Sequence, residues 1–176
     1  VILSGGFDLS AGAVISLVNV VLARSMDPVD MEANVLLWTS VGIGIGMLTG
    51  AFNGFFIAVL RLQPIVVTLS TMFIIQGITL LVMDKPGGFV SPSLGTFYMG
   101  DAITGWLPMP LVVIGVVLLA WLWLKNSRLG TAIYAVGSDP DAAAAVGVRV
   151  VFVRFLVYVI AGGCYGLAGV FISAQT

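Results

Sequence analysis

Four long stretches of this chain contain no Asp, Glu, Lys, Arg or His, and they constrain its fold more than any other feature. They cover residues 36–60, 65–82, 107–124 and 155–172. A helix needs about 20 residues, at about 1.5 Å of rise each, to cross the hydrocarbon core of a bilayer, so each run is long enough to be a span. A shorter apolar run at 9–23 predicts a short, re-entrant or broken helix. The sequence therefore predicts an all-α membrane protein, a polytopic bundle of transmembrane helices.

The composition argues against a soluble core of the same helices. Hydrophobic residues make up 60% of the chain, charged residues 9%, and the mean hydropathy is +1.16. Five buried helices with so little polar surface would not remain dissolved. The net charge of −1 implies neither nucleic acid nor an anionic lipid surface as a partner. With no histidine and one cysteine, Cys164, neither a disulfide nor a metal site is expected. The absence of an initiating methionine and of a polar tail predicts an internal piece of a longer polypeptide.

The charges between the apolar runs are distributed unevenly. If successive spans alternate in direction, the loops at 61–64 and 125–154 share one side of the membrane. This side carries five basic residues: Arg61, Lys125, Arg128, Arg149 and Arg154. The other side carries two basic residues, Arg24 and Lys85, and the acids Asp27, Asp30, Glu32, Asp84 and Asp101. Because basic loops remain in the cytoplasm, the 125–154 loop is predicted to be cytoplasmic.

Small residues recur at helical spacing in two of the predicted spans. They are Gly42, Gly46, Gly50 and Gly54 in one run and Gly162 and Gly166 in the last. A four-residue spacing places small residues on one face of a helix, where another backbone can approach closely. We interpret these glycines as helix-packing residues; an interface that moves during function is the alternative.

Few polar side chains lie at predicted membrane depth. Asn53 and Gln76 carry amide groups that must find partners or line a wet path, so both are candidates for a translocation path. In the stretch "GGFDLSAG", Asp8 or Ser10 is expected to cap the helix at 9–23, and contact with a solute or ion is the alternative role. The four long runs lack the carboxylate or histidine that proton-coupled carriers hold at mid-membrane.

A short polar helix is predicted at about 140–146, inside the basic loop. Asp139 suits an N-cap, Pro140 the first helical position, and Asp141 the first turn. The strong helix formers that follow are Ala142, Ala143, Ala144 and Ala145, and Gly147 supplies a stop. A helix this short is not stable alone in water, so either the cytoplasmic end of the bundle or a partner protein must hold it.

Three motifs, in the right order, resemble one family. "YAVGSDPDAAAAVGV" is similar to the cytoplasmic loop of permease subunits in ribose/xylose-type sugar importers of the ATP-binding-cassette class, which runs approximately A-V-G-x-N-P-E-A-A-x-x-x-G-I. "GGFDLSAGAVISL" is similar to the family's G-G-I-D-L-S-V-G-S segment. "NGFFIAVLRLQPIVVTLSTMFIIQGITLL" resembles its N-G…P-x-I-x-T-L-G-T-M-x-x-x-R-G pattern.

The resemblance implies a permease subunit of the cell inner membrane that imports a monosaccharide-like solute by alternating access. It implies that Gly137 and Asp139 to Gly147 form a coupling helix seated in a separate ATPase subunit, which would bind the ATP. Further implied partners are a periplasmic sugar-binding protein and a second permease copy, expected to form a homodimer. No residue is expected to be catalytic, and the chain lacks the G-x-x-x-x-G-K-[ST] phosphate loop.

The sequence departs from the family pattern at several positions. Asp139 replaces the usual Asn and Asp141 the usual Glu, and both changes preserve capping chemistry. Gln76 stands where an arginine is common, so a role of that arginine does not transfer. A passive channel or facilitator, an ion-coupled secondary transporter and a membrane scaffold remain alternative functions.

Overall fold

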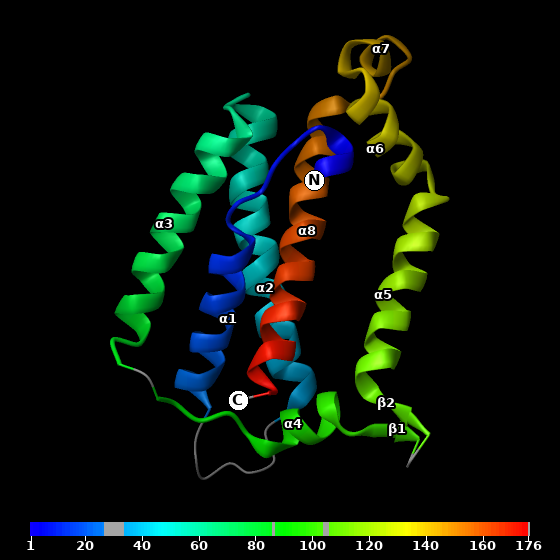
Figure 1. Cartoon of the computed structure of the whole chain (residues 1–176). Coiled ribbons are helices and arrows are strands. Elements are labelled where there is room, and N and C mark those ends of the chain that lie inside the picture. The colour runs from blue at the N-terminus through cyan, green and yellow to red at the C-terminus, as the bar shows by residue number, and fades with distance from the viewer. Residues whose placement is uncertain (27–33, 86, 104–105, 176) are drawn as a thin grey trace.

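The computed structural model describes residues 1–26, 34–85, 87–103 and 106–175, and its spanning helices run roughly parallel to one another (Figure 1). The main bundle consists of α1 (Ala11–Ser25), α2 (Val35–Gly54), α3 (Pro64–Val82) and α8 (Val150–Ser173). Helices α2 and α8 pack along most of their length, and α1 lies against α8 and α3. Helix α5 (Met109–Lys125) lies to one side, and none of its residues is buried.

Among the described residues, three helices are long and apolar enough to cross a membrane. They are Val35–Val59, which adds a π-helical turn to α2, together with α3 and α8. A fourth span results if α5 and α6 (Arg128–Ser138), which are bent by 73° at their junction, count as one. Helix α1 is apolar but shorter. The predicted class, a polytopic helical membrane protein, is confirmed.

The two ends of the bundle differ in charge, and Figure 1 shows which segments lie at each end. The short helix α7 (Pro140–Ala145), the start of the chain and the α2–α3 connection lie at one end, while α4 (Pro92–Met99) and the C-terminus lie at the other. We call the first the basic end, because it holds the five basic residues of the 61–64 and 125–154 loops. By the positive-inside rule it is predicted to be the cytoplasmic end. The acids Asp27, Asp30 and Glu32 lie outside the described residues.

Several elements were not expected from the sequence. Two short strands, β1 (Asp101–Ile103) and β2 (Leu107–Pro108), form an antiparallel pair at the end opposite the basic end, so the fold is helical with one small addition. Residues 107 and 108, expected at the start of a span, belong to β2 instead. Helix α6 begins after Ser127, whose hydroxyl accepts a hydrogen bond from the Gly130 amide at 3.2 Å.

A π-helical turn ends α2 at Phe55–Val59. The Leu60 amide donates to the carbonyl of Phe55, five residues earlier, in place of the usual four. The next residue, Arg61, has φ of +55°, a left-handed conformation that side chains other than Asn, Asp and Gly rarely adopt. Pro64 then starts α3 at a position where its missing N–H costs no hydrogen bond.

The glycine faces of α2 and α8 meet each other. A Cβ added to Gly46 would collide with the carbonyl oxygen of Gly162, and one on Gly162 would collide with the carbonyl of Gly46. A Cβ on Gly166 would likewise collide with the carbonyl of Gly42, whereas one on Gly42 would collide with the Val170 side chain; Gly50 meets the carbonyl of Tyr158. Gly54 lies slightly farther from α8, because a Cβ added to it would be 3.0 Å from the carbonyl oxygen of Phe155. The two backbones are therefore in direct contact along this seam.

The largest buried cluster lies in the half of the bundle away from the basic end. Val14, Val18 and Leu22 of α1 are fully buried there against Val170 of α8 and Leu94 of α4. Side chains along one face of α1 thus attach this short helix to the long ones. The half of the bundle nearer the basic end has no continuation of α1, and an extended segment takes its place.

Candidate functional site

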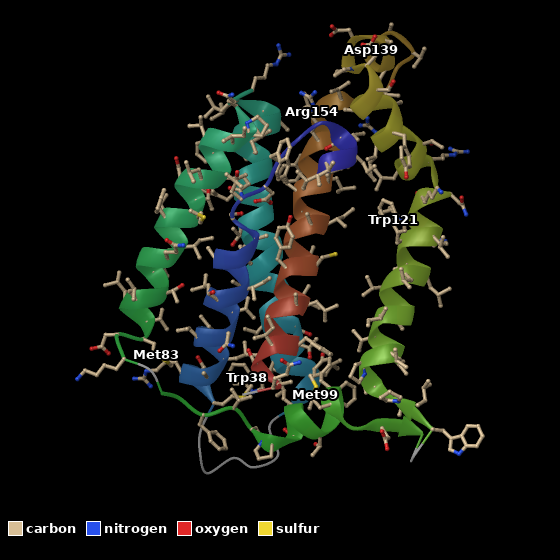
Figure 2. The ribbon with its side chains drawn as sticks, in the orientation of Figure 1. Trp38, Met83, Met99, Trp121, Asp139 and Arg154 are labelled. Atoms are coloured by element: carbon tan, nitrogen blue, oxygen red, sulfur yellow. The ribbon has the colours of Figure 1, made fainter. Side chains whose placement is uncertain are left out.

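Helix α7 is capped as the sequence predicts. One carboxylate oxygen of Asp139, Oδ1, accepts hydrogen bonds from the amides of Asp141 at 2.9 Å and Ala142 at 3.0 Å. Pro140 is the first helical residue, and the helix ends at Ala145. Gly147 follows with φ of +87°, the left-handed conformation that terminates helices. This helix protrudes at the basic end, where Figure 2 labels Asp139.

The four alanines of α7 do not share one environment. Ala143 is only 3% exposed and packs with Ile133 and Val136 of α6 and with Val153 of α8. Its methyl group attaches α7 to the chain's own bundle and faces away from any partner. The exposed residues of α7 and its C-cap are Asp141, Ala142, Ala144, Ala145 and Val146. A partner would therefore meet a smooth surface of small side chains, with Val146, 80% exposed, as its one larger apolar group.

Gly137 connects α6 to the start of the chain. A Cβ at this position would collide with the carbonyl oxygen of Leu3, in the short 3₁₀ helix η1 (Ile2–Ser4). Gly5, with φ of +77°, ends η1 and releases the chain into the extended segment that leads to α1. The surface helix α7 is therefore linked to this segment through two direct contacts, α7 on α6 and α6 on η1.

Asp8 and Ser10 do not cap α1 in the expected way. Ser10 occupies the N-cap position, but its side chain accepts no hydrogen bond from the first turn. Its hydroxyl instead donates to Oδ1 of Asp8 at 2.6 Å, and its own amide donates to the same oxygen at 3.0 Å. The prediction that Ser10 caps the helix is wrong, because its hydroxyl is turned toward other side chains, whereas Asp8 does accept the amide of Ser10 at the start of the helix.

Those side chains form a chain of hydrogen bonds across three segments. The Asn53 amide nitrogen, on α2, donates to the Ser10 hydroxyl at 3.0 Å. The side-chain oxygen of Asn53, Oδ1, accepts a hydrogen bond from the hydroxyl of Thr71, on α3, at 2.7 Å. Asn53, Ser10 and Thr71 are all buried. We refer to Asp8, Ser10, Asn53 and Thr71 as the polar cluster.

The second carboxylate oxygen of Asp8 differs from the other polar atoms of the cluster. Oδ2 is buried and has no hydrogen-bond partner among the described residues. The hydroxyl of Tyr158, on α8, donates to the backbone carbonyl of Phe7 at 3.2 Å and holds the extended segment beside this carboxylate. Non-helical backbone at membrane depth is tolerated where it is buried in protein or lines a wet path. The extended segment between η1 and α1 is therefore a site that can accommodate a polar solute.

The structure separates Gln76 from the other path candidates. Gln76 is exposed on α3, away from the polar cluster, whereas Asp8, Ser10 and Asn53 are brought together. Two members of this region, Thr71 and Tyr158, were not singled out from the sequence. Threonine in an apolar helix commonly bonds its own preceding turn, as Thr68 does to the Pro64 carbonyl at 2.9 Å, so Thr71 carried no distinguishing signal.

Comparison with known proteins places the chain in a family of transport permeases. A family model described as "branched-chain amino acid transport system / permease component" matches residues 1–176. The galactofuranose transporter permease protein YtfT of Escherichia coli K12 is 34% identical over 177 residues, which are 99% of this chain and 50% of the relative. The ribose import permease protein RbsC of the same strain is 31% identical over 179 residues, 97% of this chain and 53% of the relative.

A third relative is the D-allose transport system permease protein AlsC of Escherichia coli K12. It is 35% identical over 178 residues, which cover 99% of this chain and 53% of the relative. The chain thus spans about half the length of the curated relatives it matches. No solved structure shows a significant match to it.

Proposed function

The chain belongs to the family described as branched-chain amino acid transport system / permease component, and on that premise we propose that it is the membrane-spanning core of a sugar importer's permease subunit. Three relatives carry names that refer to galactofuranose, ribose and allose, which supports a monosaccharide-like solute for this chain as well. The protein would be a multi-pass inner-membrane subunit whose import is driven by ATP and depends on a binding protein.

The observation that carries this proposal is the exposed surface of α7 at the basic end. The Asp139 cap and the buried Ala143 fix the helix to the bundle, while Ala142, Ala144 and Ala145 remain free for contact. Small side chains allow a partner surface to approach the helix backbone closely. We assign this surface, with Gly137 and residues 139–147, to the seat of the ATPase subunit. That partner would bind and hydrolyse ATP, and this chain would hold no cofactor and act as no enzyme.

Motion of α7 has a short route to the membrane interior. Gly137 places α6 in contact with Leu3, and four residues beyond η1 the chain reaches Asp8. A displacement of α7 driven by the ATPase would therefore shift the extended segment relative to Asn53 and Thr71. Alternating access would follow from this movement combined with sliding of the glycine seam between α2 and α8.

The polar cluster suits the chemistry of a polyhydroxylated solute. Carboxylate, amide and hydroxyl groups exchange hydrogen bonds readily with sugar hydroxyls, and Oδ2 of Asp8 is an acceptor that no described residue satisfies. We assign Asp8, Ser10 and Asn53 to the translocation path, together with Thr71. Gln76 is assigned no role there. A second permease copy and a periplasmic sugar-binding protein would complete the path and deliver the solute.

The test compares two exposed positions at the basic end in the full-length permease. Ala144→Glu places a bulky acid on the contact surface, whereas Thr131→Glu places the same acid on exposed α6. We expect the first variant to insert normally, to lose the co-purifying ATPase subunit and to lose uptake at least tenfold. The second is expected to retain both. Equal uptake by the two variants, or solute equilibration in liposomes without ATP, would refute the proposal; the latter result would indicate a passive channel.

A further inference from the structure

Two connected cavities open at the basic end, between the end of α2 and the start of α8. The first has a volume of about 510 Å³ and reaches from Pro140 and Asp141 down to Ile57 and Tyr158. The second has a volume of about 680 Å³ and lies on the outer side of the first. Both are lined by Arg61, Ala144, Val150 and Val151, so they form one continuous recess.

The recess is rich in unpaired positive charge. Arg61 and Arg154 line the first cavity and Arg149 the second, against a single acid, Asp141. Within the described part of the chain none of these arginines forms an ion pair, and Arg149 lies 5.6 Å above the ring of Phe152. Figure 2 shows Arg154 on α8 at the same end of the bundle as Asp139. Three arginines with one neighbouring acid create a field that attracts an anion.

With the basic end at the cytoplasmic interface, Arg154 is expected at the depth of the lipid headgroups. It is four residues into α8, which places it about 6 Å below the start of that helix. A charged side chain near the end of a span is stable when its head reaches the interface, where phosphate groups are its natural counter-ions. The N-terminal end of α8, which also faces the recess at Val150, adds partial positive charge from its free amides.

The second cavity distinguishes a lipid from other anions. Apart from its arginines it is lined by apolar residues, including Val59, Val148, Phe152 and Phe155. An acidic side chain of a partner protein, or free phosphate, would satisfy the arginines but leave these walls uncovered. An anionic phospholipid satisfies both, because its phosphate is joined to acyl chains that bury apolar surface.

We propose that this recess binds an anionic phospholipid, with the headgroup phosphate between Arg61 and Arg154 and an acyl chain along Val59, Phe152 and Phe155. The lipid would contact Ala144 of α7 and both ends of the α2–α8 pair, and so would join the surface helix to the membrane. The inference depends on the placement of the basic end at the cytoplasmic interface and is independent of the solute carried.

The experiment measures selectivity for phosphatidylglycerol over phosphatidylcholine in the full-length permease complex, reconstituted in nanodiscs that contain spin-labelled lipid. We expect Arg61→Gln with Arg154→Gln to lower this selectivity by about fivefold per arginine, the equivalent of about 1 kcal/mol each. The corresponding lysine pair is expected to retain most of it. Arg128→Gln, an exposed arginine of α6 outside both cavities, is the matched control and should change nothing.

Three results would overturn the proposal. The first is unchanged phosphatidylglycerol selectivity in the double glutamine variant, with helix content by circular dichroism equal to that of the unmodified complex. The second is loss of the ATPase subunit without loss of lipid selectivity, which would assign the arginines to an acidic protein partner. The third is displacement of the labelled lipid by soluble glycerol phosphate as effectively as by phosphatidylglycerol, since the apolar cavity would then contribute nothing.

Discussion

Gly46 of α2 and Gly162 of α8 face each other so closely that a Cβ on either residue would strike the carbonyl oxygen of the other. This reciprocal contact lies within the most extensive helix pairing in the molecule. It leaves no space for any side chain on either helix at this level. The α2–α8 seam is therefore the part of the bundle least able to accept substitution.

Gly46→Leu is expected to destabilise the permease by about 3 kcal/mol or more, because two backbones must separate to admit the side chain. Gly44→Leu is the matched control on the same helix, since nothing lies within 4 Å of a Cβ built there. Thermal unfolding of the purified proteins in detergent compares the two. Similar midpoints for both variants would contradict the backbone contact.

Asn53→Leu is expected to cost about 1–3 kcal/mol, since it leaves the Thr71 hydroxyl and the Ser10 hydroxyl without their Asn53 partner in a buried site. Gln76→Leu, on exposed α3, should leave stability unchanged. Unfolding midpoints measure this difference, and uptake by the surviving folded protein tests the solute path. Loss of stability at Gln76 equal to that at Asn53 would argue against the polar cluster.

Asp139→Ala removes both capping hydrogen bonds of α7 and is expected to destabilise this helix by about 1 kcal/mol. Asp139→Asn retains an acceptor oxygen and should behave like the unmodified protein. Hydrogen exchange of the Asp141 and Ala142 amides measures the effect directly, and solute-stimulated ATPase activity of the assembled complex measures its consequence. Faster exchange in both variants would show that charge, and not the hydrogen bonds, holds the helix.

Gly137→Val is expected to force α6 away from η1, because its side chain would occupy the position of the Leu3 carbonyl. The ATPase subunit should still bind, since the exposed face of α7 is unchanged, but uptake should fall at least tenfold while ATP hydrolysis continues. Ser138→Val, at the next and exposed position, serves as the control. Coupled transport that survives Gly137→Val would exclude the route from α7 through η1.

The arrangement of the spans follows closely from the sequence. An unpaired backbone is costly in lipid, which favours helices for charge-free runs, and α2 with its π-helical turn and α3 match the runs at 36–60 and 65–82 to within a residue at each end. Helix α8 covers the run at 155–172 but begins five residues earlier, at Val150. The cap of α7 is equally local, because Asp139 and Pro140 act on adjacent residues. Features that depend on adjacent residues can be predicted from a single sequence.

Features that depend on contacts between distant residues could not be predicted from the sequence. Ala143 and Ala144 are identical in sequence terms, and only the packing of α7 on α6 makes one buried and the other exposed. Ser10 and Asn53 are 43 residues apart, so no local pattern could pair them. Helix α6 lies within the loop at 125–154 and was not predicted, because its buried residues Ile133 and Val136 pack against Val153 and Val157 of the distant helix α8.

The π-helical turn at Phe55–Val59 determines where Arg61 lies. This turn holds one more residue than an α-helical turn, and each residue rotates a helix by about 100°. If the same residues were wound as regular α-helix, with no residue removed, Arg61 would turn away from the recess it lines with Arg154. The position of this charge is thus set by how the residues that precede it are wound, and the winding at the end of α2 becomes as consequential for the cytoplasmic surface as the choice of arginine itself.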